Sequence, residues 1–300
     1  MRAMAMVLLI LLAAGACSPA SDTDAAPEAV PPAAAAALAA RAGGPAASSI
    51  GFAPIEPERI EVVALTDDGV DGLIETLDTL VAITTPDRMQ SEVRLHLWRF
   101  ANRLRRGTLS AAQAARVSAH LEQLAKAYPA ADTSFERTRW LVEHLYVGAV
   151  APNITGRTAS GDPLELADYR GKVVVLYFSG QWCGPCRSEY PYQRLMAEVY
   201  ADRPFAIVGV NSDSLDIARA YQAENGLDYP AFWDGPTTKG PIATRWNVTG
   251  WPTIYVLDPE GRIRFVDVRH EDTLKAVAQL LEEIPRSPAP DPAKSTTPGS

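Results

Sequence analysis

The stretch Lys172–Pro191, KVVVLYFSGQWCGPCRSEYP, limits the fold of this 300-residue chain more than any other. Its β-branched apolar run from Lys172 to Phe178 predicts a buried strand, and Gly180 predicts the break that follows. Cys183 and Cys186, with two residues between them, then stand where a helix is expected to begin. A C-x-x-C that follows a buried strand and opens a helix is typical of a dithiol redox motif.

The position of each sulfur predicts its chemistry. A helix N-terminus carries partial positive charge and unpaired N–H groups, which favour a thiolate over a thiol. Cys183 lies at that end, so we expect it to be an exposed nucleophile that attacks a partner disulfide. Cys186 lies one turn further in, so we expect it to be more buried and to resolve the mixed disulfide. Pro185 stiffens the turn between them.

Two consecutive segments resemble a known family. Trp182 to Cys186, WCGPC, resembles the active-site motif of the thioredoxin superfamily. Arg187 to Pro191, RSEYP, resembles the C-x-x-C-x-x-E-x-P extension of the TlpA/ResA-like thiol-disulfide reductases, which are tethered outside bacterial membranes. The resemblance covers about Val150 to Glu283. It implies an α/β thioredoxin-like fold with a central mixed sheet flanked by helices, client proteins that carry disulfides, and a membrane dithiol that donates electrons.

The chain departs from thioredoxin at one position. Thioredoxin has a buried Asp six residues before its first active-site Cys, whereas this chain has Tyr177 there. Glu189 lies three residues after Cys186, and so on the same face of the expected helix. We therefore hypothesise that Glu189 is the proton acceptor near the buried thiol.

A second motif, Gly250-Trp251-Pro252-Thr253, stands just before a predicted strand, Thr253–Leu257. In folds of the resembled family the equivalent Pro is cis and packs beside the C-x-x-C, and the backbone before it receives an extended partner chain. The resemblance therefore assigns Trp251 and Pro252, with Trp182 and Pro185, to client contact. Trp251 is bulkier than the usual Thr or Val, so it either biases the groove toward apolar clients or simply packs.

Other uses of a C-x-x-C fit the sequence less well. A structural zinc site needs four ligands, but the chain has three Cys and its four His are scattered: His96, His120, His144 and His270. Copper-delivery proteins need one more residue between the two Cys, and a peroxiredoxin motif needs Pro and Ser/Thr where Leu176 and Gly180 stand. We expect no metal and no other cofactor. A disulfide oxidase or isomerase, an inert disulfide, and a lipoprotein binding module with a vestigial CxxC remain open alternatives.

The N-terminus predicts export. Residues 1–16 carry an early Arg, a short apolar run and small residues, which is the pattern of a secretory signal peptide. Ala14-Gly15-Ala16-Cys17 resembles a bacterial lipobox, in which the Cys is acylated. This pattern predicts a lipoprotein anchored to a membrane of the bacterial periplasm through Cys17. An ordinary signal peptide with an incidental Cys17 is the alternative.

Composition divides the remaining chain. Residues 17–57 are rich in Ala and Pro and predict a disordered tether, and residues 285–300 predict a disordered tail. Residues 58–147 contain four amphipathic stripes and predict a small all-α domain, while residues 148–284 hold the thioredoxin-like domain. The net charge of −8 and the pI of about 5.1 do not favour nucleic-acid binding.

The thioredoxin-like part shows further elements. We expect a hairpin whose strands lie in 151–154 and 163–166, a strand over 205–210, a helix over 215–225, a turn at 233–236, and a hairpin turn at 258–261. A closing helix is expected over 272–283. Pro191 should kink the active-site helix.

Overall fold

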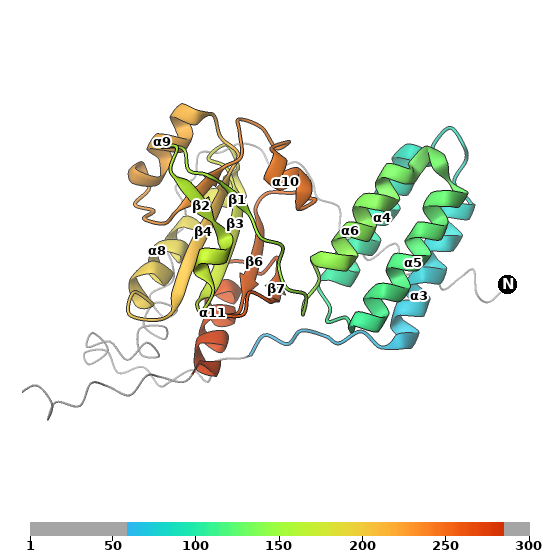
Figure 1. Ribbon diagram of the computed structural model, residues 1–300, viewed down its shortest axis with the longest axis horizontal. Coiled ribbons are helices and arrows are strands. Elements are labelled where there is room, and N and C mark those ends of the chain that lie inside the picture. The colour runs from blue at the N-terminus through green and yellow to red at the C-terminus, as the bar shows by residue number, and fades with distance from the viewer. Residues whose placement is uncertain (1–58, 285–300) are drawn as a thin grey trace, which may run out of the picture.

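The computed structural model describes residues 59–284 of the chain. The predicted signal peptide, the lipidation site Cys17, the tether and the C-terminal tail lie outside the described residues. Figure 1 shows a bundle of helices beside a β-sheet that has helices on both faces. The fold class predicted from the sequence is confirmed: a thioredoxin-like α/β region follows an all-α region.

The helical bundle contains α3 (Asp67–Ala82), α4 (Met89–Arg105), α5 (Ala111–Ala127) and α6 (Asp132–His144), with the short 3-10 helix η2 (Pro129–Ala131) before α6. Each α-helix turns its apolar stripe toward one shared core. That core includes Leu77, Val93, Leu121 and Phe135, all at most 2% exposed. The four predicted stripes therefore stabilise one another by burial, as amphipathic helices in a bundle must.

Ser110 caps the N-terminus of α5. The Ser110 hydroxyl accepts a hydrogen bond from the Gln113 N–H, and the Gln113 side chain accepts one from the Ser110 N–H. This reciprocal pair is a capping box, so Ser110 and not Thr108 begins the helix. Thr108 instead bridges to Ala64 and Val147.

The sheet has the strand order β5 (Ala231–Trp233), β4 (Phe205–Asn211), β3 (Val173–Ser179), β6 (Thr253–Leu257) and β7 (Ile263–Val266). β3 runs parallel to β4 and antiparallel to β6, so the sheet is mixed. No strand is predicted at β5, and its last residue, Trp233, is the first residue of the predicted turn. A separate hairpin joins β1 (Thr155–Arg157) to β2 (Pro163–Glu165), and its first strand begins later than expected.

Alternation along β3 divides the core into two layers. Val173, Val175 and Tyr177 face α8 (Tyr190–Val199) and α11 (Glu271–Glu283). Val174, Leu176 and Phe178 face the other side, where α10 (Pro241–Arg245) packs. All six side chains are at most 3% exposed, which explains why this strand reads as a continuous apolar run. The 3-10 helix η3 (Leu166–Tyr169) precedes β3, and α9 (Leu215–Glu224) packs through Tyr221 against Tyr190.

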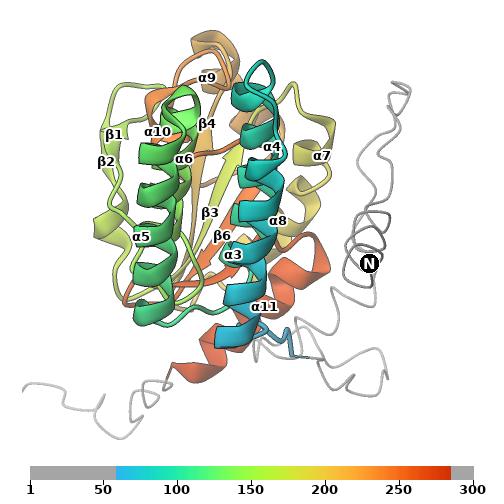
Figure 2. The ribbon, with the colours of Figure 1, turned by 90° about the vertical axis from the view of Figure 1, so that its right-hand side faces the viewer.

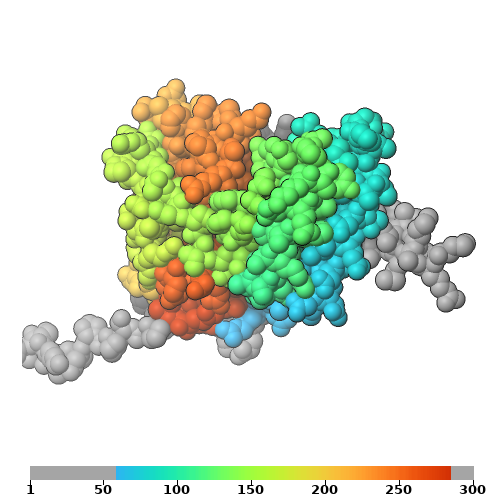
Figure 3. All heavy atoms as spheres, turned by 45° about the vertical axis from the view of Figure 1, so that its right-hand side comes forward, coloured from blue at the N-terminus to red at the C-terminus, as the bar shows by residue number. Residues whose placement is uncertain are grey.

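The bundle packs directly on the sheet, a contact that no sequence pattern predicts. Ala101, Leu141 and Leu145 of the bundle share a buried cluster with the α10 side of the sheet. Arg105 donates a hydrogen bond to the Tyr255 hydroxyl at 3.2 Å and forms an ion pair with Asp267. Figures 2 and 3 show the bundle covering one side of the thioredoxin-like region.

The junction between the two regions is hydrogen-bonded to the sheet. α6 ends at His144, and the Gly148 N–H already donates to the Ile263 carbonyl at 2.8 Å. The Ile263 N–H donates in turn to Ala149, and the Ala151 N–H to Gly261. Residues 148–151 therefore extend the sheet beside β7. Among residues 59–284, no helix has the length and apolar content that crossing a membrane requires.

Candidate active site

The two cysteines flank the first turn of α7 (Gly184–Arg187), a few residues after β3 ends. Cys183 is the N-cap of this helix, and a disulfide joins it to Cys186. The Cys186 N–H points at the Cys183 sulfur, with 3.2 Å between N and Sγ. In the reduced protein, the same N–H would stabilise a thiolate on Cys183.

Two features of the site differ from the expected geometry. The active-site helix is interrupted rather than kinked: α7 ends at Arg187, α8 begins at Tyr190, and Pro191 occupies the first turn of α8. Since α7 has only four residues, the N–H groups at its start contribute more than a macrodipole does. In the disulfide form Cys183 is only 5% exposed rather than open to solvent, while Cys186 is 1% exposed.

A buried carboxylate holds the loop before Cys183. Asp213 is 2% exposed, and its two oxygens accept the Gln181 N–H at 2.9 and 3.0 Å. The Asn211 amide donates to the same carboxylate, and Arg187 donates to the Gln181 carbonyl at 2.8 Å. No sequence pattern connects Asp213 to Gln181, because the contact joins positions 32 residues apart.

The loop before β6 places the second predicted motif beside the first. The Trp251–Pro252 peptide bond is cis, as the resemblance implies. Arg269 donates a hydrogen bond to the Pro252 carbonyl at 2.5 Å, which holds this loop in place. The ring centroids of Trp182 and Trp251 lie 5.9 Å apart. Trp182 is 54% exposed and Pro185 is also exposed, so the predicted client-contact residues include accessible surface next to the disulfide.

Glu189 lies in the break between α7 and α8 and is fully buried. Its N–H donates to the Cys186 carbonyl at 3.2 Å, and its carboxylate accepts the His270 N–H at 3.1 and 3.3 Å. Burial raises the pKa of Glu189, and His270 and Arg269 offset only part of that rise. A carboxyl group with a raised pKa is suited to exchange protons closer to neutral pH.

His270 is the site residue that sequence reasoning missed. Its backbone has a φ of 51°, and its Nε2 lies 3.1 Å from the Ser188 hydroxyl and 3.5 Å from the Glu189 carboxylate. The sequence analysis weighed His270 only as a metal ligand, and no spacing rule connects positions 189 and 270. Within residues 59–284, no three His, Cys, Asp or Glu side chains cluster closely enough to hold a metal ion.

Tyr177, the residue that replaces the thioredoxin Asp, is fully buried on the sheet face that carries α8 and α11. Burial and the nearby Glu189 carboxylate raise the pKa of Tyr177 well above its ordinary value. The phenol therefore stays neutral across the physiological pH range. It adds no charge beneath the active site, whereas Glu189 contributes a buried carboxyl group there.

Comparisons with known proteins agree with this geometry. The model of the AhpC/TSA family matches residues 147–266. The thioredoxin-like protein YneN of Bacillus subtilis is 36% identical over 125 residues, which cover 40% of this chain and 71% of YneN. The thiol-disulfide oxidoreductase ResA of Bacillus thuringiensis (strain Al Hakam) is 32% identical over 144 residues, covering 47% of this chain and 80% of ResA. The chain belongs to the ResA-like thiol-disulfide oxidoreductases.

This ResA-like protein is therefore a redox enzyme of the thioredoxin superfamily. Among solved structures it is similar to a DsbF homologue from Corynebacterium diphtheriae, at 34% identity and a TM-score of 0.39, over 43% of this chain and 87% of that one. The span matched by the family model contains both Cys183 and Cys186. The helical bundle precedes the span of the family model.

Proposed function

We propose that this ResA-like chain reduces disulfides of client proteins outside the cytoplasm, with Cys183 as nucleophile and Cys186 as resolving thiol. The observation that carries the proposal is the disulfide at the start of α7, which lies in one site with the cis Trp251–Pro252 bond and the buried Glu189. A membrane dithiol supplies the electrons in this proposal.

The proposed reaction moves two electrons to the client. The Cys183 thiolate attacks one sulfur of the client disulfide, which breaks that S–S bond and releases the other client sulfur as a thiolate that takes up a proton. Cys186 passes its proton to Glu189 and attacks the Cys183 sulfur. The mixed disulfide breaks, the second client sulfur leaves as a thiol after protonation, and the Cys183–Cys186 disulfide forms. The membrane dithiol then reduces that disulfide by the same exchange.

The N-terminal sequence supplies the proposed location. Residues 1–16 serve as the signal peptide, and acylation of Cys17 anchors the protein to a membrane of the periplasm. Radiolabelled palmitate incorporation into the wild type and into Cys17→Ala tests the anchor. Label in the wild type and not in the variant is expected, whereas equal labelling contradicts the anchor.

The direction of electron flow is tested by the reduction potential. We expect a value near that of thioredoxin, about −270 mV, whereas a value near −120 mV would indicate an oxidase. A cystine-containing client should be reduced by the wild type and not by Cys183→Ser. Cys186→Ala should instead accumulate the mixed disulfide, which also identifies the client. A wild type that reduces nothing would favour a vestigial CxxC.

A further inference from the structure

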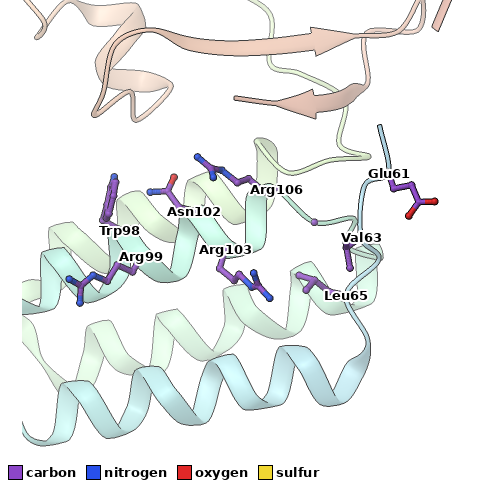
Figure 4. Close-up of a pocket in the computed structure, with 9 residues that line it drawn as sticks. Glu61, Val63, Leu65, Trp98, Arg99, Asn102, Arg103 and Arg106 are labelled. Carbon is purple, nitrogen blue, oxygen red and sulfur yellow. The ribbon is translucent and has the colours of Figure 1, made fainter. Parts of the chain in front are cut away.

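The helical bundle presents a groove whose lining carries three Arg and one acidic residue, Glu61. The groove has a volume of about 440 Å³ and runs between residues 61–65 and the outer face of α4. Its α4 wall is made by residues that recur every three or four positions and so share one face: Trp98, Arg99, Asn102, Arg103 and Arg106. In Figure 4, Trp98, Asn102 and Arg106 project toward the strands, and Val63 and Leu65 form part of the other wall.

The charge of the groove is opposite to that of the protein. The chain carries a net charge of −8, yet residues 89–106 contain five Arg and one acidic residue, Glu92. Arg99 and Arg103 are exposed, and neither forms an ion pair with any residue in the described part of the chain. Arg106 lies 3.6 Å from Asp267, which Arg105 already neutralises. The guanidinium groups of Arg99 and Arg103 are therefore the ones available to an anionic partner.

A band of tryptophans connects this groove to the disulfide. The Trp98 indole N–H donates to the Thr249 hydroxyl at 3.0 Å, and Thr249 stands two residues before Trp251. Trp251 in turn lies beside Trp182, the neighbour of Cys183. Trp98 is 48% exposed and Trp182 is 54% exposed, whereas Trp251 between them is partly buried, so the two ends of the band offer apolar surface. The Trp98–Thr249 hydrogen bond thus joins α4 to the loop before β6.

We propose that this groove binds the client: an extended polypeptide segment with acidic side chains on one flank of the disulfide-bonded Cys. The inference rests on the proposed function, because it names the clients of the same site. Charge complementarity identifies the flank as acidic, and Trp98 identifies an apolar contact between that flank and the Cys. Arg106, the C-cap of α4, stands eight positions after Trp98, which is about 12 Å along the helix axis. That length matches about four residues of an extended peptide.

The test measures exchange rates of the reduced full-length protein with synthetic disulfides. Each probe is a disulfide-linked dimer of a peptide with one Cys, a three-residue Gly/Ser spacer, and four Glu or four Gln, in both chain directions. In one direction, we expect the Glu peptide to react about fivefold faster at low salt, as two weak exposed ion pairs allow. The preference should disappear at about 0.5 M NaCl. The net charge of −8 alone would favour the Gln peptide.

Matched variants test whether the groove causes the faster reaction with the Glu peptide. R99E/R103E should lose it or reverse it, and the milder R99Q/R103Q should lose most of it. The control R137E/K239E changes the net charge equally at two exposed residues outside the groove and should retain it. The proposal is overturned if both charge-reversal variants lose the preference for the Glu peptide, or if R99E/R103E retains it. So does a wild type that reacts no faster with either Glu peptide.

A small uncharged substrate separates this inference from the proposed function. Hydroxyethyl disulfide has no flank, so the wild type and all three variants should reduce it at the same rate. If the wild type reduces hydroxyethyl disulfide but does not distinguish Glu from Gln peptides, only the acidic-flank inference fails. If it reduces neither probe, the proposed reductase function fails as well.

Discussion

Removal of Arg105 should loosen the attachment of the bundle to the sheet. The Arg105 side chain is 8% exposed and that of Asp267 is 6% exposed, so their ion pair is buried between the two regions. Although burial lowers the pKa of Arg105, Tyr255 and Asp267 raise it by more, so the guanidinium stays charged. Arg105→Ala would leave the Asp267 carboxylate buried without its main partner.

The structure sets the size of the effect. Loss of one partner of a buried ion pair typically costs about 3 to 5 kcal/mol. Arg106 and Arg269 both remain 3.6 Å from Asp267 and compensate part of the charge, so we expect the low end, about 3 kcal/mol. The Tyr255 hydroxyl also loses its hydrogen bond from Arg105. Arg106 is 62% exposed, so Arg106→Ala should cost less than about 1 kcal/mol and is the matched control.

The assay is urea unfolding of the oxidised protein, followed by tryptophan fluorescence and by circular dichroism. A double-mutant cycle with Asp267→Asn isolates the pair, and Asn suits this position because Asp267 has a φ of 57°. We expect Arg105→Ala to be far less harmful in the Asp267→Asn background. An Arg105→Ala cost equal to that of Arg106→Ala, or costs that simply add in the cycle, would refute the reasoning.

Three further predictions concern single side chains. Burial raises the pKa of Glu189 in the folded protein, so its contribution to stability is fully present below about pH 4.5 and is lost as pH rises through the raised pKa. Between pH 4 and pH 7, the unfolding free energy of Glu189→Gln should therefore increase relative to that of the wild type. A difference between the two unfolding free energies that does not change with pH, measured by urea unfolding, would contradict this. Asp234 accepts the Ile242 and Ala243 N–H groups at the start of α10, at 2.7 and 2.8 Å, and so caps this helix. Asp234→Ala should lower the unfolding free energy by about 2 kcal/mol, and Asp234→Asn by less. Equal losses for the two variants in urea unfolding would contradict a capping role for Asp234. Gly261 has a φ of 74°, so Gly261→Ala should lower the unfolding free energy by about 1 kcal/mol, and an unchanged midpoint would show that the turn adapts.

Much of the fold was predictable because local patterns agree with the final packing. β3 reads as a strand since both of its faces are buried, and β6 begins and ends at the predicted residues. The four bundle helices follow from their apolar stripes. β5 was missed because it has only three residues and forms through pairing with β4. Sequence periodicity carries no information about such a partner.

The candidate site was predictable where its residues adjoin one another in sequence. Cys183, Cys186 and Glu189 fall within one motif, and the cis Pro252 follows from family resemblance. The contacts of His270 could not be predicted, because they join positions 81 residues apart. The position of Trp98 could not be predicted either, because its indole bonds Thr249, 151 positions away, and the side chain is 48% exposed.

The tight junction after α6 restricts how this enzyme can be divided. Only a few residues separate His144 from backbone already bonded to β7, so the bundle is not a freely swinging arm. Expression of the catalytic half alone, from residue 150 onward, would strip Leu141 and Leu145 from the sheet and leave hydrocarbon facing water. Such a fragment should aggregate and be degraded readily. Experiments on this enzyme are therefore better done on a polypeptide that retains both regions.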